Sequence, residues 1–294
     1  MRDPAATTAP SSVRTHKGPY LGPGPSPPKP PGSQVEGTQA AIESAKPSFP
    51  MPKLRLEVRD LSHRGADTFL SSAHAGKALV VSVQRVLSLL YQSPASQTTT
   101  PPPTRSVTLI LRSMDGIAYT TGTELDSDHK EIHMSLGYIL GIDASRSSHE
   151  ILGVLTHELV HCFQYNGFGT CPGGLIEGVA DWVRLRSGLS PPHWKRQAGQ
   201  KWDAGYEHTG FFLEYLESRF GAGLVQRLNE KLRIAKYEEK LFWTELCGRP
   251  VGQLWGDYQK IVESENEALE EGVVVEKEDA ARLNGEPTPM DVQG

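Results

Sequence analysis

The sequence predicts an α+β fold, in which a small mixed β-sheet packed on helices is followed by a helical C-terminal half. Segments 54–58 and 130–139 alternate apolar and polar residues, as half-buried strands do. Segment 106–112, SVTLILR, is a β-branched run between turn residues, which is typical of an inner strand. From about residue 174 onward, apolar residues recur at helical spacing between breaks that contain Gly or Pro.

The remaining elements rest on their own local patterns. Segment 66–91 is predicted to be a helix, because five of its apolar residues fall on one stripe: Leu79, Val83, Val86, Leu87 and Leu90. Segment 93–104, rich in Pro and Thr, is predicted to be a loop. Segment 114–122 is predicted to hold a turn and a short strand, and 124–129 a polar loop. Further helices are predicted from Ser147, from about Gly174, from about Ala204, over 223–237 and over 250–269.

Composition indicates one folded domain, residues 52–262, between two tails. Eleven of the 22 prolines lie in the first 50 residues, so 1–51 is predicted to be a disordered tail, with a Pro-rich ligand for a partner domain as the alternative. Residues 263–294 hold ten acidic and two basic residues and are predicted to be a disordered acidic tail. We expect no nucleic-acid partner, since no Lys/Arg run is present. We also expect no membrane partner, since no stretch approaches the ~18 apolar residues of a membrane span.

The cysteines and the N-terminus bear on the compartment. The chain has three cysteines, Cys162, Cys171 and Cys247, and its first residues contain no apolar segment of the kind a secretory signal needs. Both observations favour free thiols in a reducing compartment, so a cytoplasmic location is expected. A local bridge between Cys162 and Cys171 is the alternative.

The segment 157–161, His-Glu-Leu-Val-His, carries the clearest chemical signal. Residues Ser147 to Glu150 resemble a capping box that begins the helix, with Ser147 accepting a hydrogen bond from the amide of Glu150. Positions i and i+4 share one helix face, so His157 and His161 present both imidazoles to one point, as Zn²⁺ requires. Glu158 lies beside the first ligand, where it could act as the general base toward a metal-bound water.

A catalytic zinc keeps three protein ligands, and the third must come from elsewhere. The continuation H-x-x-G-x-x-H fails here, because Gln164 and Gly167 occupy the places of the glycine and the last histidine. Glu177 is the better candidate, since the Gly/Pro loop before it lets the chain turn back. Asp181, one helix turn later, could accept the other ring N–H of a ligand histidine and fix its tautomer.

At these residues the chain resembles the plant and fungal basic secretory protein family, a group of zinc peptidases. The resemblance rests on HELVHCFQYNG, GLIEGVADWVRL and WDAGYEHTGFFLEYL, with AYTTG and HKEIHMSLGYI upstream. It covers about residues 54–262 and implies a zincin-like fold of the gluzincin kind. Under it, His157, His161 and Glu177 are metal ligands, Glu158 is the base and Asp181 supports a ligand. Members are typically secreted and basic, whereas this chain is mildly acidic, so secretion is not transferred.

The resemblance has two further implications. The Gly205-Tyr206 pair matches the family, so the Tyr206 phenol is expected to stabilise an oxyanion, with His208 as the alternative donor. Zincins hold an extended substrate against an edge strand beside the active-site helix. Segment 130–136 is the expected edge strand, and His133 on it is expected to be a surface residue.

These observations predict a zinc metallopeptidase, an endopeptidase acting as a monomer on a peptide or protein substrate, with Glu158 activating a zinc-bound water. The alternative from another class is a binding or defence protein on the same scaffold, which would hold metal with little turnover. The intact Glu158 argues against that alternative. A purely structural helical protein would bind no metal at all.

Overall fold

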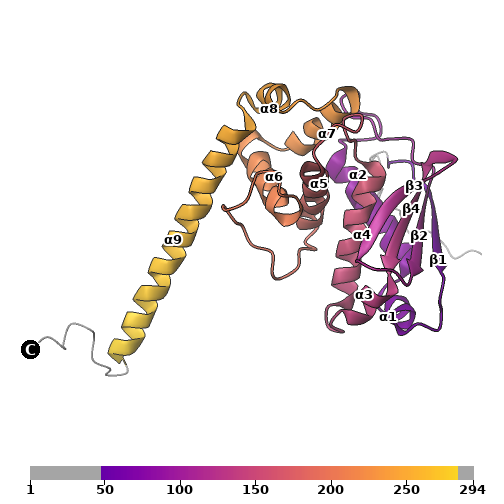
Figure 1. The fold of residues 1–294 in the computed structure, drawn as a ribbon, viewed down its shortest axis with the longest axis horizontal. Coiled ribbons are helices and arrows are strands. Elements are labelled where there is room, and N and C mark those ends of the chain that lie inside the picture. Colours follow the sequence, from indigo (N-terminus) through magenta and orange to yellow (C-terminus); the bar gives the residue numbers. More distant parts are fainter. Residues whose placement is uncertain (1–47, 284–294) are drawn as a thin grey trace, which may run out of the picture. The chain divides into compact units, whose positions relative to one another are not determined.

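The computed structural model describes residues 48–283, with side chains as far as Ala268, and Figure 1 shows its elements. Four strands form one mixed sheet in the order β1-β2-β4-β3. Strands β1 (Lys53–Val58), β2 (Ser106–Arg112) and β4 (Asp126–Ser135) are parallel, and β3 (Ala118–Thr123) pairs with β4 in the antiparallel sense. The small mixed sheet and the α+β class predicted from the sequence are confirmed.

One face of the sheet forms the core of the N-terminal half. Because strand side chains alternate between faces, the register that pairs Leu109 with Ile132 and Leu111 with Met134 places all four on the same side. These four side chains and Val107 are fully buried and belong to one apolar cluster with helix residues. The alternating and β-branched patterns therefore predicted these strands correctly, because the apolar residues on one face of the sheet are the ones that are buried.

The four helices of this half are α1 (Arg64–Ser72), α2 (Ala75–Leu90), α3 (Leu136–Gly141) and α4 (Ser147–Phe163). The single helix predicted over 66–91 is wrong, since the chain breaks at Ala73, which is extended (φ −130°, ψ 123°). The break allows α1 to pack on α3 while α2 packs on α4. The predicted apolar stripe lies wholly on α2 and is buried.

Two boundaries around β4 also differ from the prediction. The strand begins at Asp126, within the segment predicted as a polar loop, and it ends at Ser135 rather than Ile139. Ser135 then caps α3, because its hydroxyl accepts a hydrogen bond from the amide of Tyr138 at 3.3 Å. The alternation that predicted a strand to 139 was therefore ended by a local capping interaction.

The capping box predicted for α4 is not formed. Arg146 occupies the N-cap position without a side-chain cap, and the Ser147 hydroxyl donates to the carbonyl of Asp143 at 3.1 Å. The Glu150 carboxylate instead accepts from Arg146 at 2.6 Å and from Arg184 at 3.0 Å. An ion-pair network between α4 and the following helix outweighs the local motif.

The C-terminal half is helical, as predicted, with α5 (Gly173–Arg186), α6 (Tyr206–Phe220), α7 (Leu224–Ile234), α8 (Glu239–Cys247) and α9 (Val251–Leu283). Its core is aromatic, with the ring of Phe212 centred 5.1 Å from Trp255, 5.7 Å from Tyr258 and 6.2 Å from Trp243. Helix α8 was not predicted. It is short, and the fully buried Trp243 anchors it.

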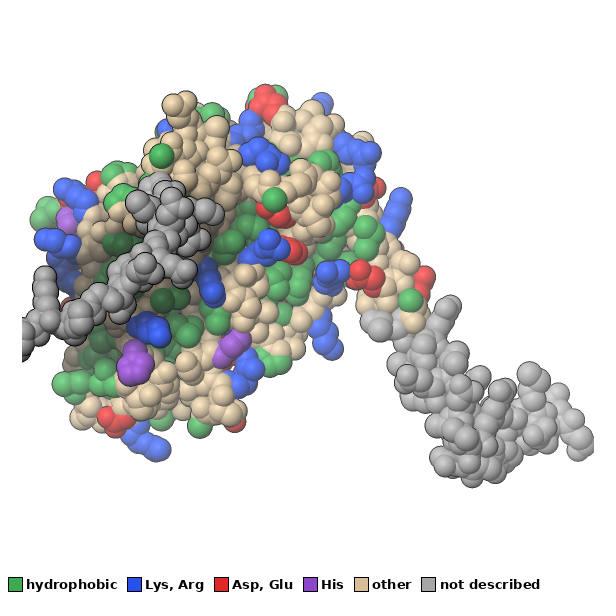
Figure 2. Space-filling view, turned by 180° about the vertical axis from the view of Figure 1, so that it is seen from behind, with side chains coloured by type: hydrophobic (Ala, Val, Ile, Leu, Met, Phe, Trp, Pro, Cys, Tyr) green, Lys and Arg blue, Asp and Glu red, His purple; other side chains and the backbone are tan. Residues whose placement is uncertain are grey.

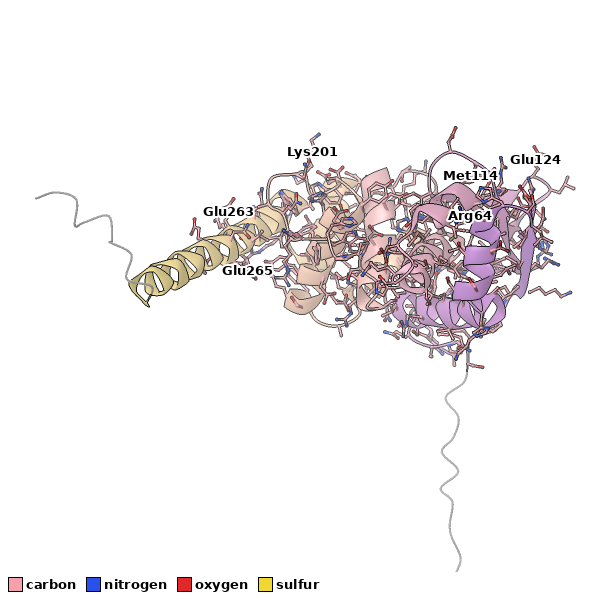
Figure 3. All side chains as sticks on the ribbon, turned by 90° about the horizontal axis from the view of Figure 1, so that it is seen from below. Arg64, Met114, Glu124, Lys201, Glu263 and Glu265 are labelled. Carbon is pink, nitrogen blue, oxygen red and sulfur yellow. The ribbon has the colours of Figure 1, made fainter. Side chains whose placement is uncertain are left out.

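Helix α9 lies across the predicted C-terminal boundary of the domain, residue 262. Figure 3 shows Glu263 and Glu265 on α9, and Glu265 pairs with Arg196 at 2.9 Å. Helix α9 extends past residue 262, the predicted end of the folded domain, and ends at Leu283. The predictions for 1–47 and 284–294 fall outside the described residues. The three cysteines are free thiols.

Two surface properties concern partners. Among the described residues, none of the helices combines the length and the apolar character that crossing a membrane requires. On the face shown in Figure 2, Lys and Arg side chains are dispersed among hydrophobic and polar ones and do not form a continuous basic field there.

Candidate metal centre

Helix α4 brings its two histidines to one point. The Nε2 atoms of His157 and His161 are 3.2 Å apart, and their rings are nearly perpendicular at a centroid distance of 4.9 Å. The opposite side of the helix is buried in the core through Leu155, Leu159 and Phe163. Helix geometry alone produces this arrangement, since one i, i+4 pair points away from the face that packs.

Helix α5 supplies the third donor. Glu177 Oε2 lies 3.0 Å from Nε2 of His157 and 3.7 Å from Nε2 of His161. The chain reverses between the helices through Gly167 and Gly169, both with positive φ, and the Asn166 side chain accepts the amide of Gly169 at 3.0 Å. The Gly/Pro loop predicted to return Glu177 to the histidines therefore does so.

The three residues fit a zinc ion. Zinc–ligand distances of about 2.0–2.1 Å in a tetrahedral site separate the ligand atoms by about 3.3 Å. The separations among His157, His161 and Glu177 range from 3.0 to 3.7 Å. Within the described part of the chain, these three are the group of His, Cys, Asp or Glu residues whose donor atoms could hold a metal ion.

Each histidine has a partner on its other ring nitrogen. Asp181 Oδ1 lies 2.6 Å from Nδ1 of His157 and is almost fully buried, as predicted for a supporting carboxylate. The side-chain amide of Gln164 lies 2.6 Å from Nδ1 of His161. In the sequence, Gln164 stands out only as a departure from another motif, and this contact was not predicted.

The carboxylates set the charge of the centre. Burial alone would lower the pKa of His157, but hydrogen bonds to Asp181 and Glu177 outweigh it and raise that pKa to about 9. For Glu177, burial opposes the shift, and hydrogen bonds from His157 and His161 hold its pKa well below the usual value. A proton on His157 thus occupies the place that a cation would take.

Glu158 is held by a residue that the sequence did not indicate. Its carboxylate accepts a hydrogen bond from the Thr120 hydroxyl at 2.7 Å, and the same hydroxyl lies 3.0 Å from the Glu158 carbonyl. Glu158 is only 6% exposed, and its charge contributes to the raised pKa of His157. Thr120 lies on β3, so the edge strand is tied to α4 at this residue.

Tyr206 lies over His157. Its ring stacks on His157 at a centroid distance of 6.3 Å and an interplanar angle of 13°. It has the left-handed backbone conformation (φ 48°), which is rare for a non-glycine residue, and it remains 56% exposed. The charge of Glu177 is the main cause of a raised pKa for this phenol, which therefore keeps its proton at neutral pH.

The alternative donor, His208, has a different environment. Its Nε2 lies 3.9 Å from the neighbouring Glu207, and its Nδ1 is buried without a hydrogen-bond partner among the described residues. The structure brings Tyr206, and not His208, into stacking contact with a triad residue.

The predicted edge strand is wrong. Residues 130–135 lie in β4, which is paired with β2 on one side and β3 on the other, so its backbone is not open. The strand at the edge beside α4 is β3. His133 is also not a surface residue, because it is buried beneath the Tyr119 ring at a centroid distance of 4.6 Å.

The fold is α+β, and two neighbouring helices bring two histidines and a glutamate together. The protein therefore has a candidate metal centre, which lies beside the buried carboxylate of Glu158. The model of the BSP family, described as a peptidase of plants and bacteria, matches residues 51–258. The match covers more than half of the chain, and the chain belongs to this family of peptidases. No curated protein and no solved structure matches it.

Proposed function

We propose that this peptidase is a zinc-dependent endopeptidase of the zincin type, with His157, His161 and Glu177 as the metal ligands. The observation that carries the proposal is the convergence of these three donor atoms next to the buried Glu158. His157 and His161 are neutral nitrogen donors once the metal displaces the proton, and Glu177 adds one negative charge. This donor set matches the two-histidine, one-glutamate sites of zinc peptidases.

A bound zinc ion would polarise the scissile carbonyl and lower the pKa of water toward ~7. Glu158 accepts the proton from the attacking water and then delivers it to the leaving amine. The Thr120 hydroxyl keeps the Glu158 carboxylate in one orientation. The Tyr206 phenol, protonated at neutral pH, donates a hydrogen bond to the developing oxyanion.

The substrate is proposed to bind along β3. This strand pairs with β4 on one edge only, and its other edge lies on the side of α4. An extended peptide can add its backbone to such an edge, with main-chain hydrogen bonds that are independent of sequence. Thr120 then connects the substrate strand with the base.

The test is the substitution Glu158→Gln, which removes the base and retains the shape of the side chain. We expect zinc content close to one ion per chain by elemental analysis, and casein cleavage lowered by about 100- to 10,000-fold. Glu245→Gln, which changes an exposed carboxylate on α8 that pairs with Lys231, is the matched control and should retain activity.

Three other outcomes would count against the proposal. Undiminished cleavage by Glu158→Gln would refute the role of the base. Wild-type protein that binds zinc without chelator-sensitive cleavage would favour a binding or defence protein. Protein without zinc affinity would refute the metal centre itself.

A further inference from the structure

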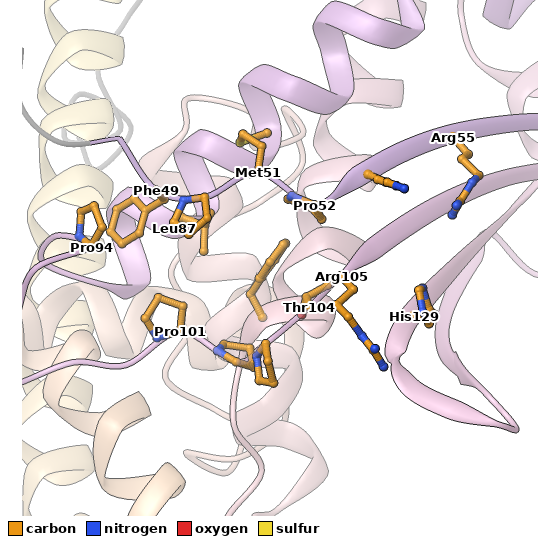
Figure 4. A pocket seen from close by; sticks show the side chains of 15 residues that line it. Phe49, Met51, Pro52, Arg55, Leu87, Pro94, Pro101, Thr104, Arg105 and His129 are labelled. Atoms are coloured by element: carbon orange, nitrogen blue, oxygen red, sulfur yellow. The ribbon is translucent and has the colours of Figure 1, made fainter.

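A cavity of about 780 Å³ lies outside the metal centre (Figure 4). It is formed where β1 and β2 begin, together with the Pro-rich loop 93–104, and no residue of the metal triad lines it. Its volume is within the range of about 300–1,000 Å³ of small-molecule sites. The family match and the proposed peptidase chemistry do not assign any role to it.

One end of the cavity is apolar. Figure 4 shows Phe49, Leu87, Pro94 and Pro101 gathered at this end. Packing positions this wall, because Leu87 is buried on α2 and the Phe49 ring packs edge-on against Tyr91 at a centroid distance of 6.4 Å. Prolines and hydrocarbon rings have no side-chain hydrogen-bond donors, so this end suits a hydrocarbon body.

The other end is cationic. Figure 4 shows Arg55, Arg105 and His129 at this end, and Lys53 also lines it. The residues that line the cavity include no Asp or Glu. The polar groups that a ligand would meet here are therefore predominantly positively charged donors, which favour an anionic head group.

Two of these cations are not neutralised within the described structure. Arg105 pairs with Asp126 and Asp128, the latter at 3.7 Å. By contrast, no ion pair joins Lys53 or Arg55 to a carboxylate of the described residues, and the nearby Glu57 pairs with Arg59 instead. Both residues are exposed on β1, two positions apart and on the same face of the strand.

The geometry points to a binding site for a fatty acid, with the carboxylate between Lys53 and Arg55 and the acyl chain toward Leu87 and Phe163. The planar guanidinium of Arg55 can donate two parallel hydrogen bonds to a carboxylate. An acyl chain at the apolar end leaves no polar group unpaired there. The inference does not rest on the proposed function.

Occupancy of this site would reach the metal helix. Phe163, in the cavity wall, is the last residue of α4 and lies two residues after His161. The Thr104 hydroxyl, also in the wall, donates to the carbonyl of Cys162 at 2.9 Å. A fatty acid at this position would therefore contact the end of the helix that carries both histidines.

The test is calorimetric titration of the full-length protein with dodecanoate at submicellar concentration. We expect saturable binding of one molecule per chain. Decanoate should bind about 15-fold more weakly, because each buried methylene is worth about fourfold. Charge reversal at the head-group end, Lys53→Glu with Arg55→Glu, should weaken binding at least tenfold. Charge reversal of two exposed cations outside the cavity, Arg64→Glu with Lys77→Glu, is the matched control and should bind as the wild type does.

A second measurement locates the ligand independently of these variants. A dodecanoate analogue with a terminal diazirine should label Phe49, Leu87 or the segment 101–104, as mass spectrometry of the digested protein would show. Equal binding of dodecyltrimethylammonium, unchanged affinity of the double variant, or labelling confined to other segments would each overturn the inference. Circular dichroism melting of the double variant shows whether a loss of binding reflects unfolding instead, in which case the labelling result decides.

Discussion

The two sides of the metal centre are built in different ways. On the α4 side, His157, Glu158 and His161 lie within a little more than one helix turn. On the α5–α6 side, Glu177 and Asp181 lie on α5 and Tyr206 begins α6. Both helices follow loops, which bring these residues to the centre. The geometry of the first side follows from the α-helix itself, whereas that of the second depends on how the helices pack.

Close backbone contacts maintain the second side. A Cβ at Gly174 would lie 1.8 Å from the carbonyl oxygen of Asp203, and one at Gly178 would lie 2.2 Å from the Thr209 side chain. Only glycine permits α5 and the approach to α6 to come this near. Under the proposed function, helix spacing on α4 supplies the base and two metal ligands, whereas the third ligand depends on how α5 packs against the approach to α6. Variants on the two sides should therefore differ in what they lose.

The largest effect is expected from Glu177→Ala. Zinc binding of about 10–16 kcal/mol over four ligands comes to about 3 kcal/mol for each, so losing one ligand should weaken zinc binding by at least about 100-fold. Competition with a chromophoric chelator measures this affinity. Glu245→Gln is again the control. Zinc affinity close to that of the wild type would show that Glu177 is not a ligand and would remove the α5 side from the metal centre.

Asp181→Asn should give the next largest effect. It retains the shape of a buried side chain 2.6 Å from Nδ1 of His157 but removes the charge that fixes the ring. Loss of such a supporting carboxylate weakens metal affinity by about 10- to 100-fold. Chelator competition should show this loss, and enzyme saturated with zinc should regain most of its activity. A variant that loses activity and keeps its zinc affinity would contradict the assignment.

Thr120→Val tests the sheet side, and here zinc affinity should not change. Removing a hydrogen bond to a charged group costs about 1.5–3 kcal/mol, so kcat/KM should fall about 20-fold. Thr120→Ser, which retains the hydroxyl, should restore the rate. Reduced zinc binding in Thr120→Val would instead indicate a structural role.

Zinc affinity should also depend on pH. The apo protein carries a proton on His157 up to about pH 9, and zinc must displace it. Zinc affinity should therefore fall by up to about tenfold for each pH unit below 9. The raised pKa of His157 stabilises the apo fold fully below the ordinary value near 6.5, and this stabilisation is lost as pH rises through 9. The rise in melting temperature on adding zinc should thus be larger at pH 8.5 than at pH 6.5, and the reverse order would contradict the proton competition.

The sequence predicted what is local and missed what depends on packing. The convergence of His157 and His161, the return of Glu177 and the contact of Asp181 with His157 all follow from helix spacing and a Gly/Pro loop. The open edge was assigned to β4 instead of β3, because strand order across a sheet is not encoded in the alternation of one strand. Thr120 was missed for the same reason, since its bond to Glu158 joins residues 38 positions apart. The capping box failed because Arg184, on another helix, engages Glu150.

The bond from Thr120 to Glu158 also constrains how β3 can change in length. Side chains on a strand alternate between two faces, so a register slip of one residue would turn Thr120 away from α4 and present a neighbour instead. The register of the β3–β4 hairpin already shifts between Gly122 and Thr123, before the strands meet again at Asp126. A shift of β3 by two residues would keep each of its side chains on the same face of the sheet. A shift by one residue would leave the strands paired but would turn Thr120 away, so that Glu158 would lose its hydrogen-bond donor. The register of this hairpin is therefore constrained by the hydrogen bond from Thr120 to Glu158 on α4, as well as by strand pairing.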